Sequence, residues 1–410
     1  MEDNDLFQTL LGLTAPWHVV RVELALDQSE VHVYVEHDAD EWRCAECGQP
    51  APIYDHAPGR VWRHLDTMQY TTLLHAETPR VECDEHGVRS VRVPWGEPKS
   101  RFTLLFERLA IEVLLRTSVA AASRLLRLSW DEAWGIQQRA VARGLERKEH
   151  RVPACIGVDE KAVGKGQDAY VTIVCDAKQG TVEWVAPGRK AESLGGYFEQ
   201  FPAELLQAIE AVTMDVWRGF TKAVHEHVPG AVEKMVYDRF HVMQEVNEAV
   251  DRVRKIEHRK LLGQGQSLLT GSKYLWLRAS ENVPRRFRVA FASLKRSVVH
   301  TARAWAIKES LRNLWNLQTM AGAERFFRRW YFWATHSRLQ PMIAAAKKLH
   351  RHRVKLLNYF RVRLTNAMSE SINGRIERLK RIANGYRNFE NFRIAVLFRY
   401  GGLNLFPATH

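Results

Sequence analysis

Hydrophobic and polar residues alternate along two stretches near the start of the chain, residues 18–26 and 30–37. An alternation with a period of two places the apolar side chains on one face of a strand, and the short polar link between the stretches predicts a β-hairpin. A second pair of alternating stretches follows at residues 69–78 and 88–95, after a segment rich in proline. Residues 1–98 are therefore expected to form a small β-rich module.

Further along the chain, the spacing of apolar residues becomes helical. Residues 102–117 and 118–126 carry apolar side chains at intervals of three and four, which predicts two helices. Ser129 is placed to cap a third helix whose first turn is acidic, as helix N-termini favour. Three helices with a tight turn before the last are typical of a helix-turn-helix over residues 99–150, although a plain three-helix bundle has the same pattern.

Short β-rich stretches and helical stretches follow one another beyond Pro153. Strands are expected at residues 154–160, 169–176, 181–188, 211–216 and 232–238, and helices at residues 191–208 and 218–227 and from residue 240 onward. This order predicts a mixed sheet with helices over residues 151–245. Residues 246–360 have helical character throughout, and residues 361–410 are expected to add helices, one of which ends near Gly385. The expected fold class is a multidomain α+β and α/β protein.

The length and composition agree with several globular domains. The chain has 410 residues, 46% of them hydrophobic and 26% charged, which is enough for roughly two to four domains. No apolar run approaches the roughly 18 residues of a membrane-spanning helix, and the acidic start lacks the basic segment of a secretory signal. We expect a cytoplasmic protein without a membrane partner. Five cysteines, an odd number, argue against a disulfide scaffold.

Charge is distributed unevenly around a net value of +13. Residues 1–50 hold eleven acids and two bases, whereas residues 251–363 hold twenty-six Lys or Arg and five acids. Surfaces that only meet solvent usually mix both signs. The basic segment therefore favours a polyanionic partner such as nucleic acid over a plain solvated surface.

Two cysteine-containing pairs have the spacing of metal ligands. Cys44 and Cys47 form a C-x2-C pair, Cys83 and His86 form a C-x2-H pair, and 35 residues separate the two pairs. Two such pairs can close a tetrahedron of sulfur and nitrogen ligands around Zn²⁺, and a site with four protein ligands is structural. The separation is longer than in compact zinc fingers, and three histidines could compete as ligands: His56, His64 and His75.

Two acids stand at the ends of short apolar runs in the predicted sheet. Asp159 follows "CIGV" and Asp215 follows "AVTM". Burial disfavours the charged form of a carboxyl group, so two such acids in one small sheet favour a bound cation over simple strand-end capping. Carboxylate oxygens suit Mg²⁺, and two such ions about 3.5 to 4 Å apart can activate a water and stabilise the leaving oxygen of a phosphodiester.

Glu370 is the only acid between Glu324 and Glu377, in a segment rich in Lys, Arg and aromatic residues. It is expected on a helix, with Asn373, Glu377 and Lys380 close to one side of it. A two-metal site usually requires a third acid, and Glu370 is the candidate. The alternative is a helix acid that balances its basic neighbours.

Four motifs identify a resemblance that covers nearly the whole chain: "IGVDEKAVGKGQDAYVTIVCD", "TMDVWRGF", "DRFHV" and "NAMSESINGRIERLKRIANGYRNFENFR". They closely resemble the DDE transposases of bacterial insertion sequences, specifically the ISL-three family. The resemblance implies a ribonuclease-H-like catalytic core, with Asp159 on its first strand, Asp215 on its fourth and Glu370 on a later helix. It also implies that the basic helical residues 246–360 are an insertion between the second and third acids.

The same resemblance implies roles for the flanking segments and for two further side chains. The N-terminal β module becomes a zinc-binding module, and the three helices become a helix-turn-helix. Asp238 and His241 match a pattern found after the fifth strand, which implies a supporting role with His241 close to the metals or the scissile phosphate. Asp238 is equally compatible with a helix N-cap. Relatives commonly carry a second C-x2-C pair where this chain has Cys83 and His86, and imidazole can replace thiolate at zinc.

The implied activity is cutting and joining of double-stranded DNA with Mg²⁺ or Mn²⁺. Asp159, Asp215 and Glu370 would hold two ions. Water then attacks a phosphodiester at the end of the element, and the freed 3′-hydroxyl attacks target DNA. Because the two ends of the element must meet, a homodimer is expected at synapsis. Because the partner is DNA, an association with the nucleoid is also expected.

DNA contacts are expected from three parts of the chain. The zinc module and the third helix should read the terminal inverted repeats, and the basic insertion should grip the backbone. The candidate residues are Arg139, Arg143, Arg285, Arg286, Arg328, Arg329, Lys380 and Arg381. Four tryptophans of the insertion are expected mainly in its core rather than on bases: Trp305, Trp315, Trp330 and Trp333.

Two other functional classes are compatible with parts of this pattern. A non-catalytic DNA-binding regulator would keep the zinc module and the helix-turn-helix but would not need all three acids. A ribonuclease-H-like nuclease or resolvase would cut without strand transfer, and the N-terminal reading modules and the long insertion weigh against it.

Overall fold

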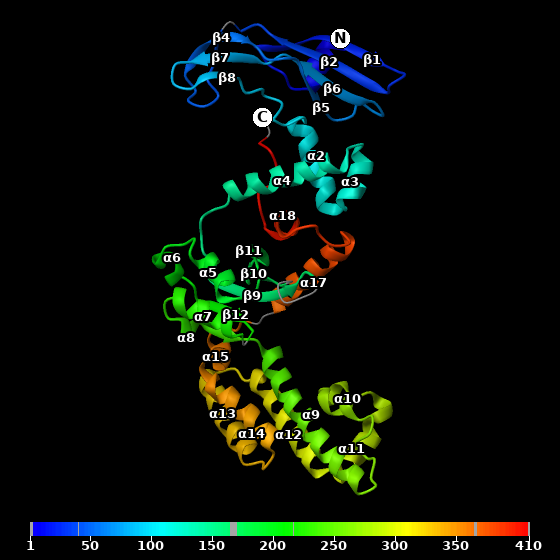
Figure 1. Cartoon of the computed structure of the whole chain (residues 1–410), viewed down its shortest axis with the longest axis vertical. Helices are drawn as coiled ribbons and strands as arrows, with labels where there is room; N and C mark the ends of the chain where they lie inside the picture. The colour runs from blue at the N-terminus through cyan, green and yellow to red at the C-terminus, as the bar shows by residue number, and fades with distance from the viewer. Residues whose placement is uncertain (1–2, 40, 165–169, 216, 365–366, 409–410) are drawn as a thin grey trace. The chain divides into compact units, whose positions relative to one another are not determined.

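The structure is a computed structural model that describes residues 3–39, 41–164, 170–215, 217–364 and 367–408. The chain separates into two compact units, residues 1–148 with 397–410 and residues 149–396 (Figure 1). The expected C-terminal part, residues 361–410, is divided between the units, because the boundary falls within α18 (Phe389–Tyr400).

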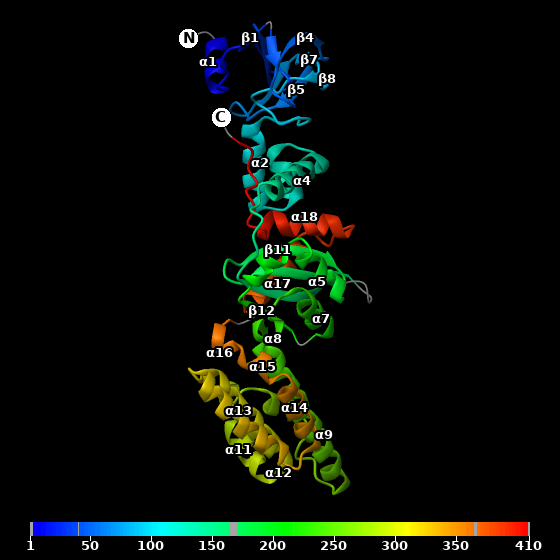
Figure 2. The same ribbon diagram turned by 90° about the vertical axis from the view of Figure 1, so that its left-hand side faces the viewer.

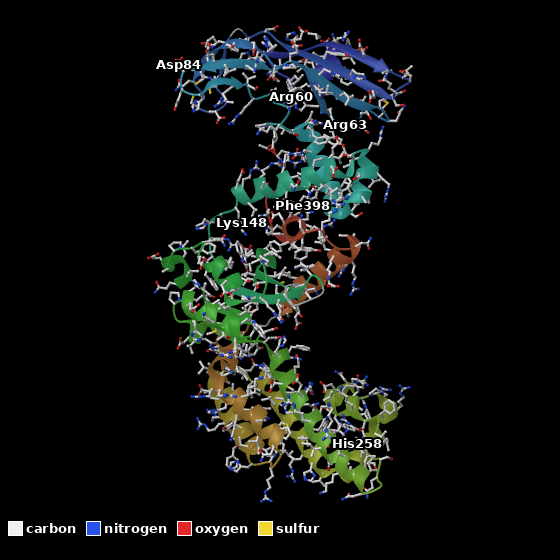
Figure 3. All side chains as sticks on the ribbon, viewed as in Figure 1. Arg60, Arg63, Asp84, Lys148, His258 and Phe398 are labelled. Carbon is white, nitrogen blue, oxygen red and sulfur yellow. The ribbon has the colours of Figure 1, made fainter. Side chains whose placement is uncertain are left out.

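Two four-stranded sheets form most of the N-terminal part of the first unit. After helix α1 (Asp3–Leu10) the strands are β1 (Trp17–Ala25), β2 (Glu30–His37), β3 (Glu41–Arg43), β4 (Pro50–His56), β5 (Arg60–Arg63), β6 (Thr71–Ala76), β7 (Pro79–Cys83) and β8 (Gly87–Ser90). The sheet orders are β1-β2-β6-β5 and β3-β4-β7-β8. The predicted hairpin is confirmed as the antiparallel pair of β1 and β2, with Val22 opposite Val33. Figure 3 shows Arg60 and Arg63 on β5.

The second pair of alternating stretches does not form a pair of neighbouring strands. β6 belongs to the first sheet and β8 to the second. Strand β7, which the alternation did not reveal, lies between them in the chain and pairs with β8. Residues 91–95 are not in a strand, but Val91 and Trp95 are buried in the core of the module.

Three helices complete the first unit, as the sequence predicts: α2 (Leu104–Arg116), α3 (Val119–Leu126) and α4 (Trp130–Glu146). The predicted cap is confirmed, because the Ser129 side chain accepts a hydrogen bond from Glu132 N while Glu132 reaches back to the Ser129 backbone. Arg127 adopts a left-handed conformation with φ 54° in the tight turn between α3 and α4. The Arg399 guanidinium donates to the carbonyls of Leu114 and Leu115, which the end of α2 leaves unpaired.

A five-stranded mixed sheet organises the second unit. Its strands are β9 (Cys155–Ala162), β10 (Tyr170–Asp176), β11 (Thr181–Pro187), β12 (Ala211–Met214) and β13 (Met235–Tyr237). Their order is β11-β10-β9-β12-β13, with β9 to β11 antiparallel and β12 and β13 parallel to β9. The predicted mixed sheet is confirmed, although its last strand is shorter than expected because residues 231–234 form helix α8 (Ala231–Lys234).

Helices cover both faces of this sheet (Figure 2). On one face, α5 (Ala191–Phe198), α6 (Ala203–Gln207) and α7 (Arg218–His227) enclose a core that includes Ile156, Val158, Val212 and Met214. The other face carries α17 (Ala367–Ile382), which contacts β9. The single helix predicted over residues 191–208 is two helices, because Pro202 lacks an N–H group and stands at the start of α6.

The remainder of the second unit is helical, as predicted, with no strand among the described residues 239–364. Its α-helices are α9 (Arg239–Gly263), α10 (Lys273–Leu277), α11 (Arg288–Ser297), α12 (Val299–Arg312), α13 (Met320–Thr335), α14 (Gln340–Arg351), α15 (Arg353–Leu357) and α16 (Tyr359–Val362), and short 3₁₀ turns join some of them. Figures 1 and 2 show α13 and α14 side by side. Trp315 and Trp330 are buried in this helical core and Trp305 packs against it, whereas Trp333 is 40% exposed. No helix in the described part of the chain is long and apolar enough to span a membrane.

Glu257 of α9 joins two helices of this region by capping the start of α12. Its carboxylate accepts hydrogen bonds from His300 N at 3.1 Å and from Thr301 N and Thr301 Oγ1 at 2.6 Å. The residue before α12, Val298, has no side-chain acceptor of its own. Glu257 is only 9% exposed, so its charge is stabilised mainly by these donors and by the positive end of the helix.

We predict that Glu257→Gln lowers the thermal unfolding midpoint at pH 7, because hydrogen bonds to a charged acceptor each contribute about 1.5–3 kcal/mol. Burial would raise the pKa of Glu257, but the hydrogen bonds from Thr301 and His300 hold it below the ordinary 4.5. The stabilisation is therefore full above pH 4.5 and disappears as the pH falls through the lower pKa of the folded state. Differential scanning calorimetry measures the unfolding midpoint of Glu257→Gln, and of the exposed control Glu248→Gln, from neutral to acidic pH. Equal unfolding midpoints of the two variants at every pH would contradict the prediction.

Candidate active site

Three neighbouring parallel strands bring three acids to one edge of the sheet. Met214 of β12 lies opposite Val158 of β9 and opposite Tyr237 of β13. The next residue on each strand path is an aspartate: Asp159, Asp215 and Asp238. Because adjacent strands are about 4.8 Å apart, this register places the three carboxyl groups in a row. Asp159 lies within β9, whereas Asp215 and Asp238 directly follow β12 and β13.

His241 and Asp238 enter this row from the start of α9. Asp238 is the N-cap of α9 and accepts a hydrogen bond from Phe240 N at 3.2 Å. One turn later, His241 Nε2 lies 2.8 Å from Asp215 Oδ1. One ligand atom from each of Asp215, Asp238 and His241 lies within 4.8 Å of the others. The pattern that the sequence singled out at residues 238–241 is therefore adjacent to Asp215.

Helix α17 lies along β9 through side chains on one of its faces. Asn373 Nδ2 donates to Asp159 Oδ2 at 2.6 Å, Glu377 pairs with Lys161 at 3.0 Å, and Lys380 donates to the carbonyl of Ala162 at 3.2 Å. Ser369, one turn before Asn373, is 3% exposed and contacts Cys175. The predicted neighbours of Glu370 on the helix are thus the residues that bind the strand.

Glu370 stands between Ser369 and Asn373 on α17, with its side chain exposed. It is therefore less than one turn from the residue that touches Asp159. Burial is the main cause that raises the pKa of Asp238, and the negative charge of Glu370 raises it further. Helix α17 consequently brings Glu370 to the same side of the sheet as the row of aspartates.

Burial and neighbouring charges shift the pKa values of the side chains in this row. Burial and then the charge of Asp215 raise the pKa of Asp159 to about 7, and burial raises the pKa of Asp238. The hydrogen bond to Asp215 raises the pKa of His241 and favours its charged form. The pKa values of the two aspartates rise because burial and neighbouring negative charges disfavour a carboxylate, whereas the same negative charges favour the protonated imidazole.

The donor set fits a hard divalent cation. Carboxylate oxygens are the ligands that Mg²⁺ and Mn²⁺ prefer, and a cation would remove the repulsion that raises the pKa of Asp159. Asp238 Oδ2 is buried without a hydrogen-bond partner among the described residues. A buried acceptor of this kind usually has a water or an ion as its partner.

A cavity of about 250 Å³ opens beside Asp215 and His241. Its wall includes Trp217 from the sheet side, Glu245 from α9 and Lys348 from α14. Lys348 Nζ and Glu245 form an ion pair at 2.6 Å. The helical part of the unit therefore contributes directly to the surroundings of the acids.

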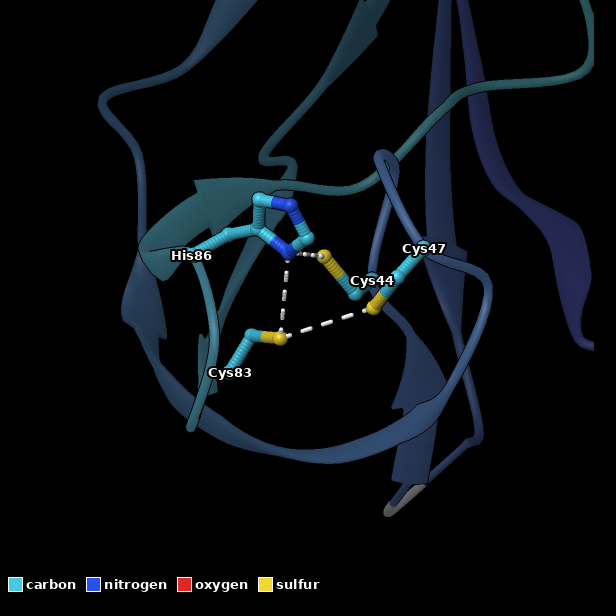
Figure 4. A group of neighbouring side chains, drawn as sticks. All are labelled: Cys44, Cys47, Cys83 and His86. Atoms are coloured by element: carbon cyan, nitrogen blue, oxygen red, sulfur yellow. Dashed lines mark hydrogen bonds between the residues drawn. The ribbon is translucent and has the colours of Figure 1, made fainter.

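The predicted metal ligands of the first unit form one cluster (Figure 4). Cys47 Sγ and Cys83 Sγ are 3.6 Å apart, and His86 Nδ1 is 3.7 Å from Cys83 Sγ and 3.9 Å from Cys44 Sγ. A tetrahedron with zinc–sulfur bonds of about 2.3 Å has edges of about 3.8 Å. The hydrogen bond with His86 lowers the pKa of the Cys83 thiol to about 6, toward the thiolate that binds metal. The arrangement suits a structural Zn²⁺ ion.

The three competing histidines lie against other partners. His56 contacts His37 and His75 contacts His32, each at 2.9 Å between ring nitrogens, and His64 Nδ1 lies 2.9 Å from Thr103 Oγ1. None of them belongs to the cysteine cluster. Among the histidines that the sequence left open, His86 is the one placed to complete the tetrahedron.

Arg143 does not face outward from α4, which corrects its prediction as a DNA contact. It is 6% exposed, and its guanidinium donates to Glu97, to Glu107 at 2.7 Å and to the carbonyl of Leu405 at 2.5 Å. A buried guanidinium held by two carboxylates cannot reach a base without breaking these bonds. Arg139 is half-buried and donates to Glu107 at 3.1 Å, so it also forms an ion pair with this buried glutamate.

The other basic residues proposed to contact DNA are more accessible. Arg285, Arg286, Arg328 and Arg329 are exposed on the helical part of the second unit. Lys380 is half-buried against β9, and Arg381 is exposed and lies 3.5 Å from Glu377. Their contact with DNA remains a prediction.

Three residues near the acids received no role from the sequence: Gly157, Ser369 and Trp217. Gly157 interrupts the buried run "CIGV", and a glycine inside a strand often marks a close approach of another segment. That signal was present but not used. Ser369 and Trp217 carried no comparable signal, because their surroundings depend on contacts between segments distant in the chain.

Comparisons with known proteins identify the class of protein as a transposase. A family model described as "Transposase" matches residues 156–396, a "Helix-turn-helix domain of transposase family ISL3" matches residues 91–141, and a "zinc-finger of transposase IS204/IS1001/IS1096/IS1165" matches residues 40–86. The chain belongs to the ISL3 family of transposases. The resemblance inferred from its motifs is thereby confirmed.

Two curated relatives match over almost their full length. The transposase for insertion sequence element IS1557 of Mycobacterium tuberculosis is 28% identical, over 100% of this chain and 98% of the relative. The transposase for insertion sequence element IS1001 of Bordetella parapertussis is 27% identical, over 98% of this chain and 99% of the relative. Each match spans the zinc-finger, helix-turn-helix and transposase regions.

We predict that the purified protein contains one zinc ion and that Cys83→Ser and His86→Ala both reduce the zinc content strongly, because each removes one of four ligands. Atomic emission spectroscopy measures the zinc content of each variant, and thermal unfolding before and after chelation of the zinc measures the change in the unfolding midpoint. Cys155→Ser, a buried cysteine outside the cluster, is the matched control. Full zinc content in His86→Ala would show that another residue completes the site.

Proposed function

We propose that this transposase cuts DNA at the ends of its element and joins the freed 3′-hydroxyl to target DNA, with Asp159, Asp215 and Glu370 holding two Mg²⁺ or Mn²⁺ ions. The parallel register that sets Asp159 beside Asp215 is the observation that carries the proposal. The contact of Asn373 with Asp159 supports the third ligand, because Glu370 lies less than a turn away.

A ribonuclease-H-like core with a helical insertion is part of this proposal. Three antiparallel strands followed by two parallel ones, in the order β11-β10-β9-β12-β13, support the core. The helical residues 246–360 fall in the chain between Asp215 and Glu370, in agreement with an insertion. The remaining divisions, at residues 98, 150 and 361, follow the changes of pattern along the chain.

Each side chain has a separate task in the proposed reaction. Asp159, Asp215 and Glu370 supply negatively charged oxygen ligands, and bound divalent ions would activate the attacking oxygen and stabilise the leaving one. His241, held 2.8 Å from Asp215, can retain a proton beside the scissile phosphate and keep the Asp215 carboxylate oriented. Asp238 fixes the start of α9 and thereby the position of His241.

DNA recognition is proposed for the other parts of the chain. The zinc module and the helix-turn-helix would select the terminal inverted repeats. Exposed arginines of the helical region would hold phosphates near the cavity beside Asp215, where Lys348 forms part of the wall. Joining two ends to one target requires two catalytic sites, so the proposed assembly is a homodimer on DNA.

We predict that Asp159→Ala, Asp215→Ala and Glu370→Ala each reduce metal-dependent cleavage of the element's end DNA by at least about a hundredfold, since changing mere partners of metal ligands already costs about 10- to 100-fold. DNA affinity should stay within about twofold of wild type. Strand cleavage and strand transfer are followed on labelled duplex with Mg²⁺ or Mn²⁺. Glu192→Ala, exposed on α5, is the control.

The outcomes separate the alternatives. Cleavage at the wild-type rate in the three variants would contradict the catalytic assignment. End binding without cleavage in any metal would favour a DNA-binding regulator. Cleavage without joining of the 3′-hydroxyl would favour a nuclease or resolvase.

A further inference from the structure

The contact between α17 and β9 is unusually close at Gly157. A Cβ atom at this position would overlap Ser369 Oγ and lie 2.7 Å from Cys175 Sγ. Ser369 is 3% exposed and cannot swing into solvent. Glycine weakens a strand, so its presence in the central strand is explained by the depth at which the helix lies.

A second contact sets the register of the helix along the strand. Asp159 accepts a hydrogen bond from Glu160 N at 2.8 Å on one carboxylate oxygen and from Asn373 Nδ2 at 2.6 Å on the other. Asn373 is three residues after Glu370, so one bond links the first acid to the helix that bears the third. Asn373 Oδ1 is itself buried without a hydrogen-bond partner among the described residues.

We propose that Gly157 and Asn373 are positioning residues of the metal site: Gly157 sets the depth of α17 on β9, and Asn373 sets its register. The proposal rests on the proposed roles of Asp159 and Glu370. A shift of about 1 Å in a catalytic group can cost a factor of about 100 in rate. An added methyl group at Gly157 forces a displacement of this size, because the facing atoms belong to buried side chains.

A compensating pair of substitutions tests the depth. Gly157→Ala should lower the affinity for Mn²⁺, measured by electron paramagnetic resonance without DNA, by about 10- to 100-fold. Adding Ser369→Gly together with Cys175→Ala removes both the hydroxyl and the sulfur atom that the new methyl group meets, and should restore most of the affinity and of the cleavage activity. Gly196→Ala in α5, where a Cβ would lie 3.7 Å from Trp184, should bind Mn²⁺ like wild type.

Asn373→Ala tests the register at a half-buried position and should also lower Mn²⁺ affinity by about 10- to 100-fold, with an unchanged unfolding midpoint. Wild-type affinity in Gly157→Ala or Asn373→Ala would overturn the positioning role of that residue. Failure of Ser369→Gly combined with Cys175→Ala to improve Gly157→Ala would overturn the steric explanation. If Asp159→Ala itself bound Mn²⁺ normally, the proposed metal site would fail instead.

The outward face of α4 carries small and polar side chains. The residues on this face are Asp131, Gly135, Gln138 and Ala142, and they are exposed or half-exposed. A Cβ at Gly135 would have its nearest neighbour at 3.5 Å, so nothing inside the chain requires glycine there. Glycine in a helix interior destabilises the helix relative to alanine, so its presence on this exposed face indicates a partner that approaches closely.

We infer that α4 reads DNA through Gln138 and that the base it selects is adenine. Gln138 is exposed, and its amide makes no hydrogen bond within the described part of the chain. The match to a helix-turn-helix domain of a transposase family favours double-stranded DNA as the partner, and Arg143 is buried and does not reach the surface of α4. Glutamine can donate to and accept from the N6 and N7 positions of adenine in the major groove.

Selection of bound duplexes from a randomised 20-base-pair library tests this inference independently of catalysis. Gln138→Ala should lose an adenine preference of about 10- to 100-fold at one position, and Gln138→Arg should change that preference to guanine. Gly135→Ala should weaken DNA binding while raising the unfolding midpoint, which a purely structural glycine would not do. Unchanged preferred sequences in both Gln138 variants, or unchanged affinity in Gly135→Ala, would overturn the inference.

Discussion

The parallel pairing of β9, β12 and β13 is the constraint on which the candidate active site depends. Because Val158, Met214 and Tyr237 lie at one level of the sheet, the residue after Met214 lies one strand spacing from the residue after Val158 and one from the residue after Tyr237. Three carboxyl groups so placed repel, and burial adds to the effect. The fold tolerates them through donors on every side: Glu160 N and Asn373 for one acid, His241 for the second and Phe240 N for the third.

Both helices that flank the acids are anchored by the same row. Helix α9 begins at Asp238, so the last acid of the row is also the cap of the helix that leads into the helical region. Helix α17 returns to β9 and is held there by Asn373, Glu377 and Lys380. The long separation in sequence between Asp215 and Glu370 is therefore spanned by a region that starts and finishes at the sheet. The stability of that region, including the Glu257 cap on α12, affects the site indirectly through these two attachments.

The excess of basic residues is divided between structural and exposed positions. Arg143 is buried beside two glutamates, and Arg399 binds carbonyls at the end of α2. Lys308, 1% exposed, donates to the carbonyls of Trp276 and Arg278. Basic side chains used in this way satisfy backbone groups that helix ends leave unpaired. A charge count along the sequence therefore overstates the surface available to DNA, and exposure must be known before an arginine is assigned to it.

The sequence by itself determined the elements and their chemistry: the hairpin at β1 and β2, the Ser129 cap, the mixed sheet, the paired metal ligands and the acids beside apolar runs. These features are encoded by neighbours within a few residues, where periodicity, turn chemistry and ligand spacing act. Only the tertiary structure decided that β7 separates two alternating stretches, that Arg143 turns inward, and that Ser369 and Asn373 meet Gly157 and Asp159. Such contacts join residues up to 262 positions apart, and the packing of whole elements, rather than any local pattern, sets which side chains meet.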